Sequence, residues 1–189
     1  HDIVTTSFDA IRLKILALPK ATNKKEVSEA IDKDIASVNN QVRLISHRLS
    51  PLQHKVKEAT LIDIIIDQLS EFQFYRKIFV KIQHPLPSEL NRFSLDAQTN
   101  IYGILLEVLH NVEKHSKGTI FALSHNVNKE NLLLTFSDNG IGFNKDSDKG
   151  IGLLNIRQRA KLLRGEISII SSNEGTDITL SVPLKLQTE

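Results

Sequence analysis

Two short glycine-rich stretches decide the fold: residues 137–143 read SDNGIGF, and residues 149–156 read KGIGLLNI. The first follows a run typical of a strand, and the second opens a run with helical character. An aspartate at the end of a strand can accept a hydrogen bond from an exocyclic amine, and the glycines after it let a flat base approach the backbone. Bare amides at the start of a helix suit an anion. The two stretches therefore predict a pocket for a base and a phosphate, with the polar segment between them as a flap.

A helix with a polar edge precedes these stretches. Its start signal is Ser94, and a buried apolar stripe runs along it from Ile101 to Val112. At about 100° per residue, Glu107, Asn111 and Lys114 share a narrow arc beside that stripe. An Asn oxygen can bind Mg²⁺ together with waters and phosphates, Glu can orient or deprotonate a group, and Lys can meet phosphate charge. On this helix alone, the same arc is also explained by a solvated helix face.

The remaining segments from residue 61 onward mix helices and strands without regular alternation. This predicts an α+β fold in which helices pack on one face of a mixed sheet. Besides the helix that starts at Ser94, the pattern predicts helices over 61–74 and 152–165 and strands over 78–84, 119–127, 131–138, 166–172 and 176–184.

The first part of the chain has a different period, and no glycine occurs before Gly103. Apolar residues from Val4 to Leu18, and again from Ile31 to Leu52, are spaced alternately by four and three. We expect a helical hairpin that pairs with a second copy into a four-helix bundle, although the spacing also suits an unspecialised coiled coil. The predicted domains are a hairpin over 1–55 and a second domain over 56–189.

The composition excludes some classes. The chain has 189 residues, a net charge of +2 and no cysteine. Disulfides and cysteine metal sites are therefore excluded, and the charge gives no reason to expect a nucleic-acid partner. No apolar run approaches the ~20 residues of a membrane span, so we expect no direct membrane contact from this fragment. The lack of disulfides suits a reducing compartment, and we expect a cytoplasmic location, either of the whole protein or of the cytoplasmic part of a membrane-anchored sensor.

Four segments resemble motifs of one known family. EVLHNVEKH (107–115) resembles its N box, DNGIGF (138–143) and GIGL (150–153) its two glycine boxes, and EGTDITLSVPL (174–184) its closing strand. The region resembles the ATP-binding domain shared by sensor histidine kinases, type II topoisomerases, heat-shock chaperones and mismatch-repair ATPases. The sequences of these motifs are most similar to those of histidine kinases in the subfamily that includes nitrate and membrane-fluidity sensors. Arg164 stands where that subfamily usually has a glycine, and we expect a small backbone adjustment there.

The resemblance implies roles for the matched positions. Asn111 would bind Mg²⁺, Glu107 would lie beside the γ-phosphate of ATP, and Asp138 would bind the adenine amino group. The other implied nucleotide-binding residues are Lys114 and His115 near the phosphates, Thr176 near the adenine through water, and Gly140, Gly142, Gly150, Gly152 and Leu153 in the pocket and lid.

The resemblance extends to the N-terminal hairpin. HDIVTTSFDAIRLKIL (1–16) resembles the phosphoacceptor helix, with His1 as the acceptor and Asp2 as its acidic neighbour. His47 is a competing acceptor, but no acid follows it. Thr6 stands where much of the subfamily has a glutamine that positions a water for dephosphorylation, so we expect phosphatase activity that is weak or uses a different geometry.

Together these features imply a sensor histidine kinase core. It would use ATP to phosphorylate His1, act as a homodimer through the hairpin, and pass the phosphoryl group to an aspartate of a response regulator receiver domain. Two alternatives stay open: another ATPase or anti-sigma-type serine kinase of the same fold, and a degenerate, non-catalytic dimeric module.

Overall fold

The computed structural model describes Ile15, Ile31, Ile35 and residues 59–143 and 151–187. The chain divides into two compact units, residues 1–50 and 51–189. Ile15, Ile31 and Ile35 are helical. The rest of the predicted hairpin, with its boundary at residue 55, lies outside the described residues.

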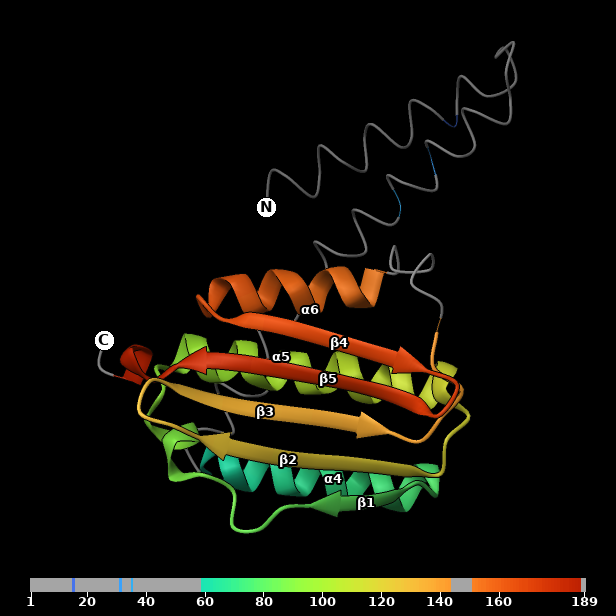
Figure 1. Cartoon of the computed structure of the whole chain (residues 1–189), viewed down its shortest axis with the longest axis horizontal. Coiled ribbons are helices and arrows are strands. Elements are labelled where there is room, and N and C mark those ends of the chain that lie inside the picture. Colours follow the sequence, from blue (N-terminus) through green and yellow to red (C-terminus); the bar gives the residue numbers. More distant parts are fainter. Residues whose placement is uncertain (1–14, 16–30, 32–34, 36–58, 144–150, 188–189) are drawn as a thin grey trace. The chain divides into compact units, whose positions relative to one another are not determined.

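The second unit is built on one five-stranded sheet with the order β1-β2-β3-β5-β4 (Figure 1). Strands β1 and β2 are parallel, and the other neighbours are antiparallel. The strands are β1 (Phe79–Ile82), β2 (Ile120–Val127), β3 (Asn131–Asp138), β4 (Glu166–Ser172) and β5 (Gly175–Pro183). All five predicted strands are confirmed. The first is shorter than predicted, because Pro85 and Pro87 follow it closely and proline cannot donate a ladder hydrogen bond.

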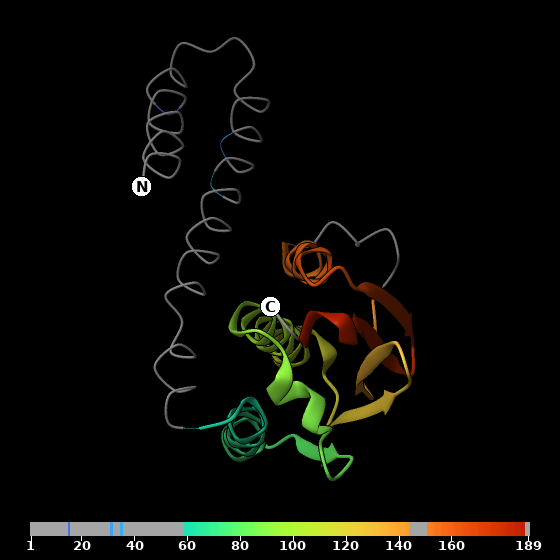
Figure 2. The ribbon, with the colours of Figure 1, turned by 90° about the vertical axis from the view of Figure 1, so that its left-hand side faces the viewer.

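Three α-helices of the described ranges cover one face of this sheet (Figure 2). They are α4 (Leu61–Arg76), α5 (Leu95–Asn111) and α6 (Ile151–Leu162). Short helical turns lie at η2 (Ser88–Arg92), η3 (Val112–Ser116) and η5 (Leu184–Gln187). The predicted α+β arrangement, with helices on one face of a mixed sheet, is confirmed for this unit.

The core lies between the helices and the sheet. Alternate residues of β3 are buried, and its neighbour β5 buries Ile178, Leu180 and Val182 in the same way. From α5, Ile101, Ile104 and Leu105 are at most 1% exposed. Each such side chain contributes about 2 kcal/mol by leaving water. This packing fixes the face that α5 turns toward the sheet.

Local sequence sets the ends of α4 and α5. The Thr60 hydroxyl accepts a hydrogen bond from the Asp63 amide, and the Asp63 carboxylate accepts one from the Thr60 amide, which makes a capping box. Ser94 caps α5 through the Ala97 amide at 3.3 Å, so the predicted start is confirmed. Beyond Asn111 the chain continues as the π-type turn η3.

The end of α6 contains the substitution noted in the sequence. Arg164 has a φ of 47°, in the left-handed region. The Arg164 amide donates to the Lys161 carbonyl at 3.0 Å, and the Gly165 amide donates to the Ala160 carbonyl at 2.9 Å. This is the conformation that favours glycine after a helix, so an arginine side chain occupies it at a cost.

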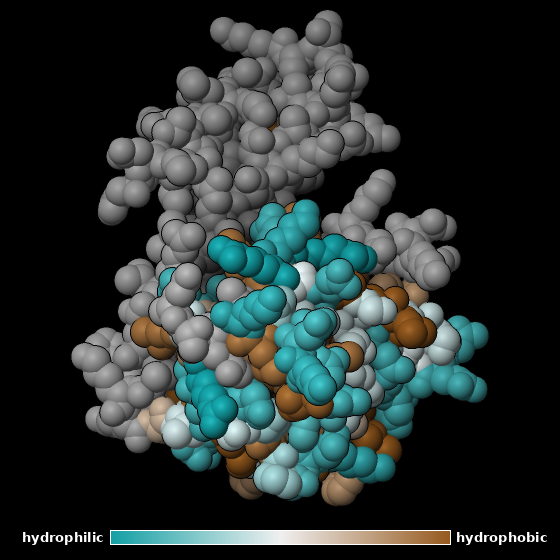
Figure 3. Space-filling view, turned by 60° about the vertical axis from the view of Figure 1, so that its left-hand side comes forward, coloured by the Kyte–Doolittle hydropathy of each residue, from teal (hydrophilic) through white to brown (hydrophobic). Residues whose placement is uncertain are grey.

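On the face shown in Figure 3, apolar side chains lie scattered among polar ones. In the part of the chain that the structure describes, no helix is both long enough and apolar enough to cross a membrane.

Candidate functional site

Asp138, the last residue of β3, is the centre of the first part of the site. Its Oδ1 accepts hydrogen bonds from the Ser116 hydroxyl at 2.7 Å and from the Gly140 amide at 2.8 Å. The Ile141 amide donates to the Ser116 carbonyl at 2.8 Å. A Cβ on Gly140 would overlap the hydroxyl and carbonyl of Ser116. Glycine is therefore needed where these two loops meet.

Gly142 turns the chain toward the β4–β5 turn. Its φ is +60°, and a Cβ there would collide with the Ser172 carbonyl oxygen. The next amide, of Phe143, donates to the Ser171 hydroxyl at 2.9 Å, and that hydroxyl lies 3.1 Å from the Thr176 hydroxyl. Thr176 is buried and pairs with Asp138 across the β3–β5 ladder. The structure thus brings the predicted residues Asp138, Gly140, Gly142 and Thr176 into one region.

Asn139 supports this region and was missed in the sequence. Its Oδ1 accepts hydrogen bonds from the amides of Thr119 at 2.9 Å and Ile120 at 2.8 Å, where β2 begins. An Asn side chain that follows a strand commonly forms hydrogen bonds with nearby backbone groups, so the residue type could have indicated this role. The sequence did not show that the partner would be the start of β2.

The second part of the site lies where α5 faces the start of α6. A Cβ on Gly152 would lie 3.0 Å from Asn111 Oδ1 and 3.4 Å from Glu107 Oε2. The carboxamide and the carboxylate therefore flank bare backbone at the first turn of α6. Glu107 is only 3% exposed, whereas Asn111 is half-buried.

Residues on α6 complete this second part, and the sequence interpretation missed them. Asn155 Nδ2 donates to Glu107 Oε1 at 3.3 Å. Arg159 is 4% exposed and donates from Nη1 to Asn100 Oδ1 at 3.2 Å. Burial lowers the pKa of the Arg159 guanidinium, and the charge of Glu107 acts in the opposite direction. Asn155 and Arg159 are four residues apart, and each precedes a buried apolar residue, Ile156 or Ala160. This spacing could have indicated that the two polar side chains share one face of the helix.

Other predicted residues are placed differently. Lys114 and His115 are exposed in η3, beyond the end of α5. The π-type turn changes the rotation per residue, so these two residues do not continue the α-helical arc that begins at Glu107. Their approach to a phosphate stays a prediction. Leu153 is buried on α6. The predicted residues His1, Asp2, Thr6 and Gly150 lie outside the described residues.

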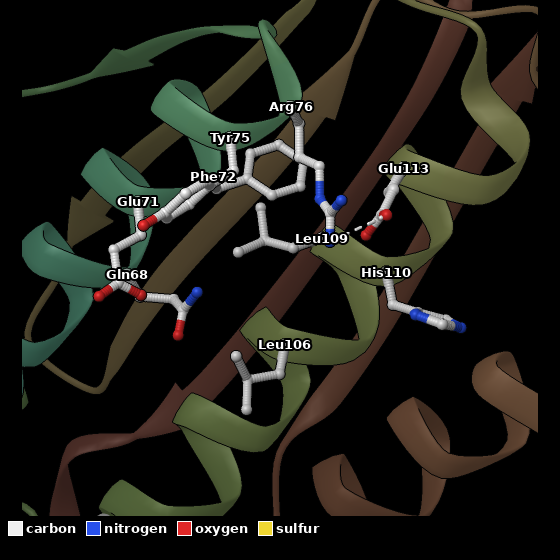
Figure 4. Close-up of a pocket in the computed structure, with 9 residues that line it drawn as sticks. All are labelled: Gln68, Glu71, Phe72, Tyr75, Arg76, Leu106, Leu109, His110 and Glu113. Carbon is white, nitrogen blue, oxygen red and sulfur yellow. Dashed lines mark ion pairs between the residues drawn. The ribbon is translucent and has the colours of Figure 1, made fainter.

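A groove of about 470 Å³ lies between α4 and α5, and its lining residues do not include those of the two regions above (Figure 4). It contains the ion pair of Arg76 and Glu113, 3.1 Å apart. Within the described ranges, no group of three or more His, Cys, Asp or Glu residues is placed to hold a metal ion.

Residues 96–186 match the family model described as histidine kinase-, DNA gyrase B- and HSP90-like ATPase. The match contains both glycine-lined regions and implies the use of ATP.

Sequence relatives cover almost the whole chain. The oxygen sensor histidine kinase NreB of Staphylococcus carnosus is 28% identical over 97% of this chain and 54% of its own length. The sensor protein VraS of Staphylococcus saprophyticus is 28% identical over 97% of this chain and 53% of its own length. The chain thus spans about half the length of these relatives.

A solved structure has the same fold. The histidine kinase domain of a blue-light activated histidine kinase from Erythrobacter litoralis superposes with a TM-score of 0.61 at 18% identity. The match covers 95% of this chain and 97% of that domain.

Proposed function

We propose that this chain, which over residues 96–186 belongs to the histidine kinase-, DNA gyrase B- and HSP90-like ATPases, is the catalytic core of a sensor histidine kinase. It would transfer the γ-phosphoryl group of ATP to a histidine of its own and then pass it to an aspartate of a response regulator. The observation that carries the proposal is the approach of Gly152 to Glu107 and Asn111, together with the oriented carboxylate of Asp138.

The Asp138 region suits an adenine. Within the described ranges, both hydrogen bonds to this carboxylate fall on Oδ1. We propose that Oδ2 accepts the adenine amino group and that Thr176 assists through a water. Gly140 and Gly142 let the chain after Asp138 pass close to Ser116 and Ser172, which shapes this region.

The α5–α6 region suits a triphosphate and a divalent ion. Asn111 offers a neutral oxygen beside bare backbone, which is a donor that Mg²⁺ accepts together with phosphate oxygens and water. Asn111 would hold Mg²⁺, which when bound neutralises charge on the phosphates. Lys114, His115, Gly150, Gly152 and Leu153 are the further residues that we propose for the phosphates and lid.

We propose that His1 is the phosphoacceptor. An imidazole nitrogen of His1 attacks the γ-phosphorus, the bond to the β-phosphate oxygen breaks, and ADP leaves. Asp2 would fix the tautomer of the ring and balance the positive charge that develops on it, while Glu107 would orient the reacting groups.

The relatives support the proposed partners and setting. Several are sensor histidine kinases by name, and one, DegS of Brevibacillus brevis, is named a histidine-protein kinase/phosphatase and is 24% identical. We propose that the chain dimerises through residues 1–55, works in the cytoplasm, and meets a receiver domain. With threonine at position 6, we expect only weak phosphatase activity.

One experiment tests the proposal. The protein is incubated with γ-labelled ATP and Mg²⁺, and the protein-bound label is tested for acid lability. The expected result is acid-labile label that is absent in His1→Gln and retained in the matched control His47→Gln. Acid-stable label would favour a serine kinase of the same fold, and a protein that takes no label would favour a non-catalytic module.

A further inference from the structure

Three polar side chains are buried together where α5 packs on α6. Glu107 and Asn155 are 3% exposed, and Arg159 is 4% exposed. Burying a carboxylate and a guanidinium costs free energy unless each is paired and hydrogen-bonded. A cluster of this kind therefore needs an explanation beyond packing.

The contacts join the cluster to three successive turns of α6. Gly152 lies against Asn111 and Glu107, Asn155 donates to Glu107, and Arg159 donates to Asn100. The charge of the buried Arg159 interacts with that of Glu107. Helix α6 therefore acts on the Glu107 carboxylate in two ways. The Asn155 side-chain amide donates a hydrogen bond to it, and the positive charge of Arg159 interacts with it.

Gly103 makes room for this arrangement. A Cβ on Gly103 would lie 2.6 Å from Arg159 Cζ and 2.7 Å from Arg159 Nη1. The guanidinium therefore lies directly on the backbone of α5, one turn before Glu107. A methyl group at this position would displace the guanidinium without removing any charge from the chain.

We propose that Asn155 and Arg159 are positioning residues that hold the Glu107 carboxylate in place, so that the seating of α6 on α5 sets the geometry of phosphoryl transfer. This inference rests on the proposed function, because it takes Glu107 to act beside the γ-phosphate. Neither Asn155 nor Arg159 needs to touch the nucleotide.

The decisive variant is Gly103→Ala. Alanine favours a helix more than glycine does, and the group that must move is the end of a flexible side chain, so the fold should be kept. We expect kcat for autophosphorylation to fall about 10–100-fold while the Kd for ATP changes little, because a small displacement of a reacting group is costly. An unchanged kcat would overturn the proposal.

Arg159→Met and Arg159→Lys extend the test. The methionine variant should lower kcat and stability, because it removes a buried positive charge that interacts with Glu107. The lysine variant keeps the charge and should recover part of kcat. Lys161→Met, an exposed position on the same helix, is the matched control and should leave both quantities unchanged. In a Glu107→Gln background, Arg159→Met should lower kcat no further, and an additive loss would contradict action through Glu107.

A double-mutant cycle of melting temperatures does not depend on kinase activity. Its four proteins are the wild type, Glu107→Gln, Arg159→Met and the double variant. Non-additive changes for Glu107→Gln and Arg159→Met support a coupling between the two side chains, and additive changes overturn it. If the unmodified protein takes no acid-labile label while the melting temperatures are non-additive, the proposed function fails and the coupling of Arg159 to Glu107 stands.

Discussion

The Ser116 hydroxyl donates a hydrogen bond of 2.7 Å to the carboxylate of Asp138, 22 residues later in the chain. The same carboxylate oxygen, Asp138 Oδ1, accepts a hydrogen bond from the Gly140 amide at 2.8 Å. The carboxylate is therefore oriented by the protein itself, through one side chain and one backbone group. Orientation of this kind lowers the ordering cost of binding a ligand.

The first prediction concerns this carboxylate. Asp138→Asn keeps the size of the side chain but removes a charged acceptor, and hydrogen bonds to charged groups contribute about 1.5–3 kcal/mol. We expect the Kd for ATP in a binding titration to rise about 10–100-fold. Asp177→Asn, an exposed position on β5, is the control and should bind ATP normally. Equal affinity of the two variants would argue against adenine recognition by Asp138.

The second prediction concerns Gly142. A side chain there meets both a φ of +60° and the Ser172 carbonyl, so Gly142→Ala should destabilise the protein by about 1–3 kcal/mol and weaken ATP binding. Chemical denaturation and a nucleotide titration measure the two effects. The neighbouring Ile141→Ala is the control, since Ile141 is 54% exposed. Wild-type stability for Gly142→Ala would show that the turn accommodates a side chain.

The third prediction concerns Arg164. Arg164→Gly relieves the left-handed backbone, which costs about 1–2 kcal/mol in an L-residue, but gives the unfolded chain more freedom. We expect a net gain of about 0.5–1 kcal/mol in the free energy of unfolding. Autophosphorylation should be unaffected. Arg157→Gly, within α6, should instead destabilise, because glycine is a poor helix former. A loss of stability in Arg164→Gly would contradict the backbone explanation.

The fourth prediction concerns pH. The hydrogen bonds from the side chain and the amide of Thr60 lower the pKa of Asp63 below its usual 3.8. A lowered pKa in the folded state contributes stability above the unfolded pKa, and this contribution is lost as pH falls through the folded pKa. Asp63→Asn should therefore be less stable than wild type at neutral pH, and the difference should shrink below about pH 4.

Thermal unfolding at several pH values measures this dependence. Asp67→Asn, an exposed position on the same helix, is the matched control. A difference between Asp63→Asn and wild type that stays constant with pH would rule out titration of the cap.

Much of the second unit was predictable because its signals are local. The period-2 pattern of residues 131–138 and the apolar stripe of α5 depend only on which face is buried. Asp138 and its glycines were predictable for a similar reason, because a strand end followed by glycines is visible in a few residues.

The missed features depend on pairing between distant segments. Asn155 and Arg159 are polar residues on a helix, and only the packing of α6 on α5 shows that they are buried. The π-type turn after Asn111 was also missed, since the sequence pattern there continues an α-helical period. Strand order is a further example, because alternation shows a strand's buried face but not its neighbours.

That strand order has a consequence for how the chain is made. Of the five described strands, β5 is the last to leave the ribosome, yet it lies inside the sheet, between β3 and β4. In the described sheet, β4 pairs with β5, so during synthesis β4 has no partner until the final strand emerges. The same strand brings Thr176 opposite Asp138. The sheet and the region around Asp138 are therefore completed together, when β5 takes its place between β3 and β4.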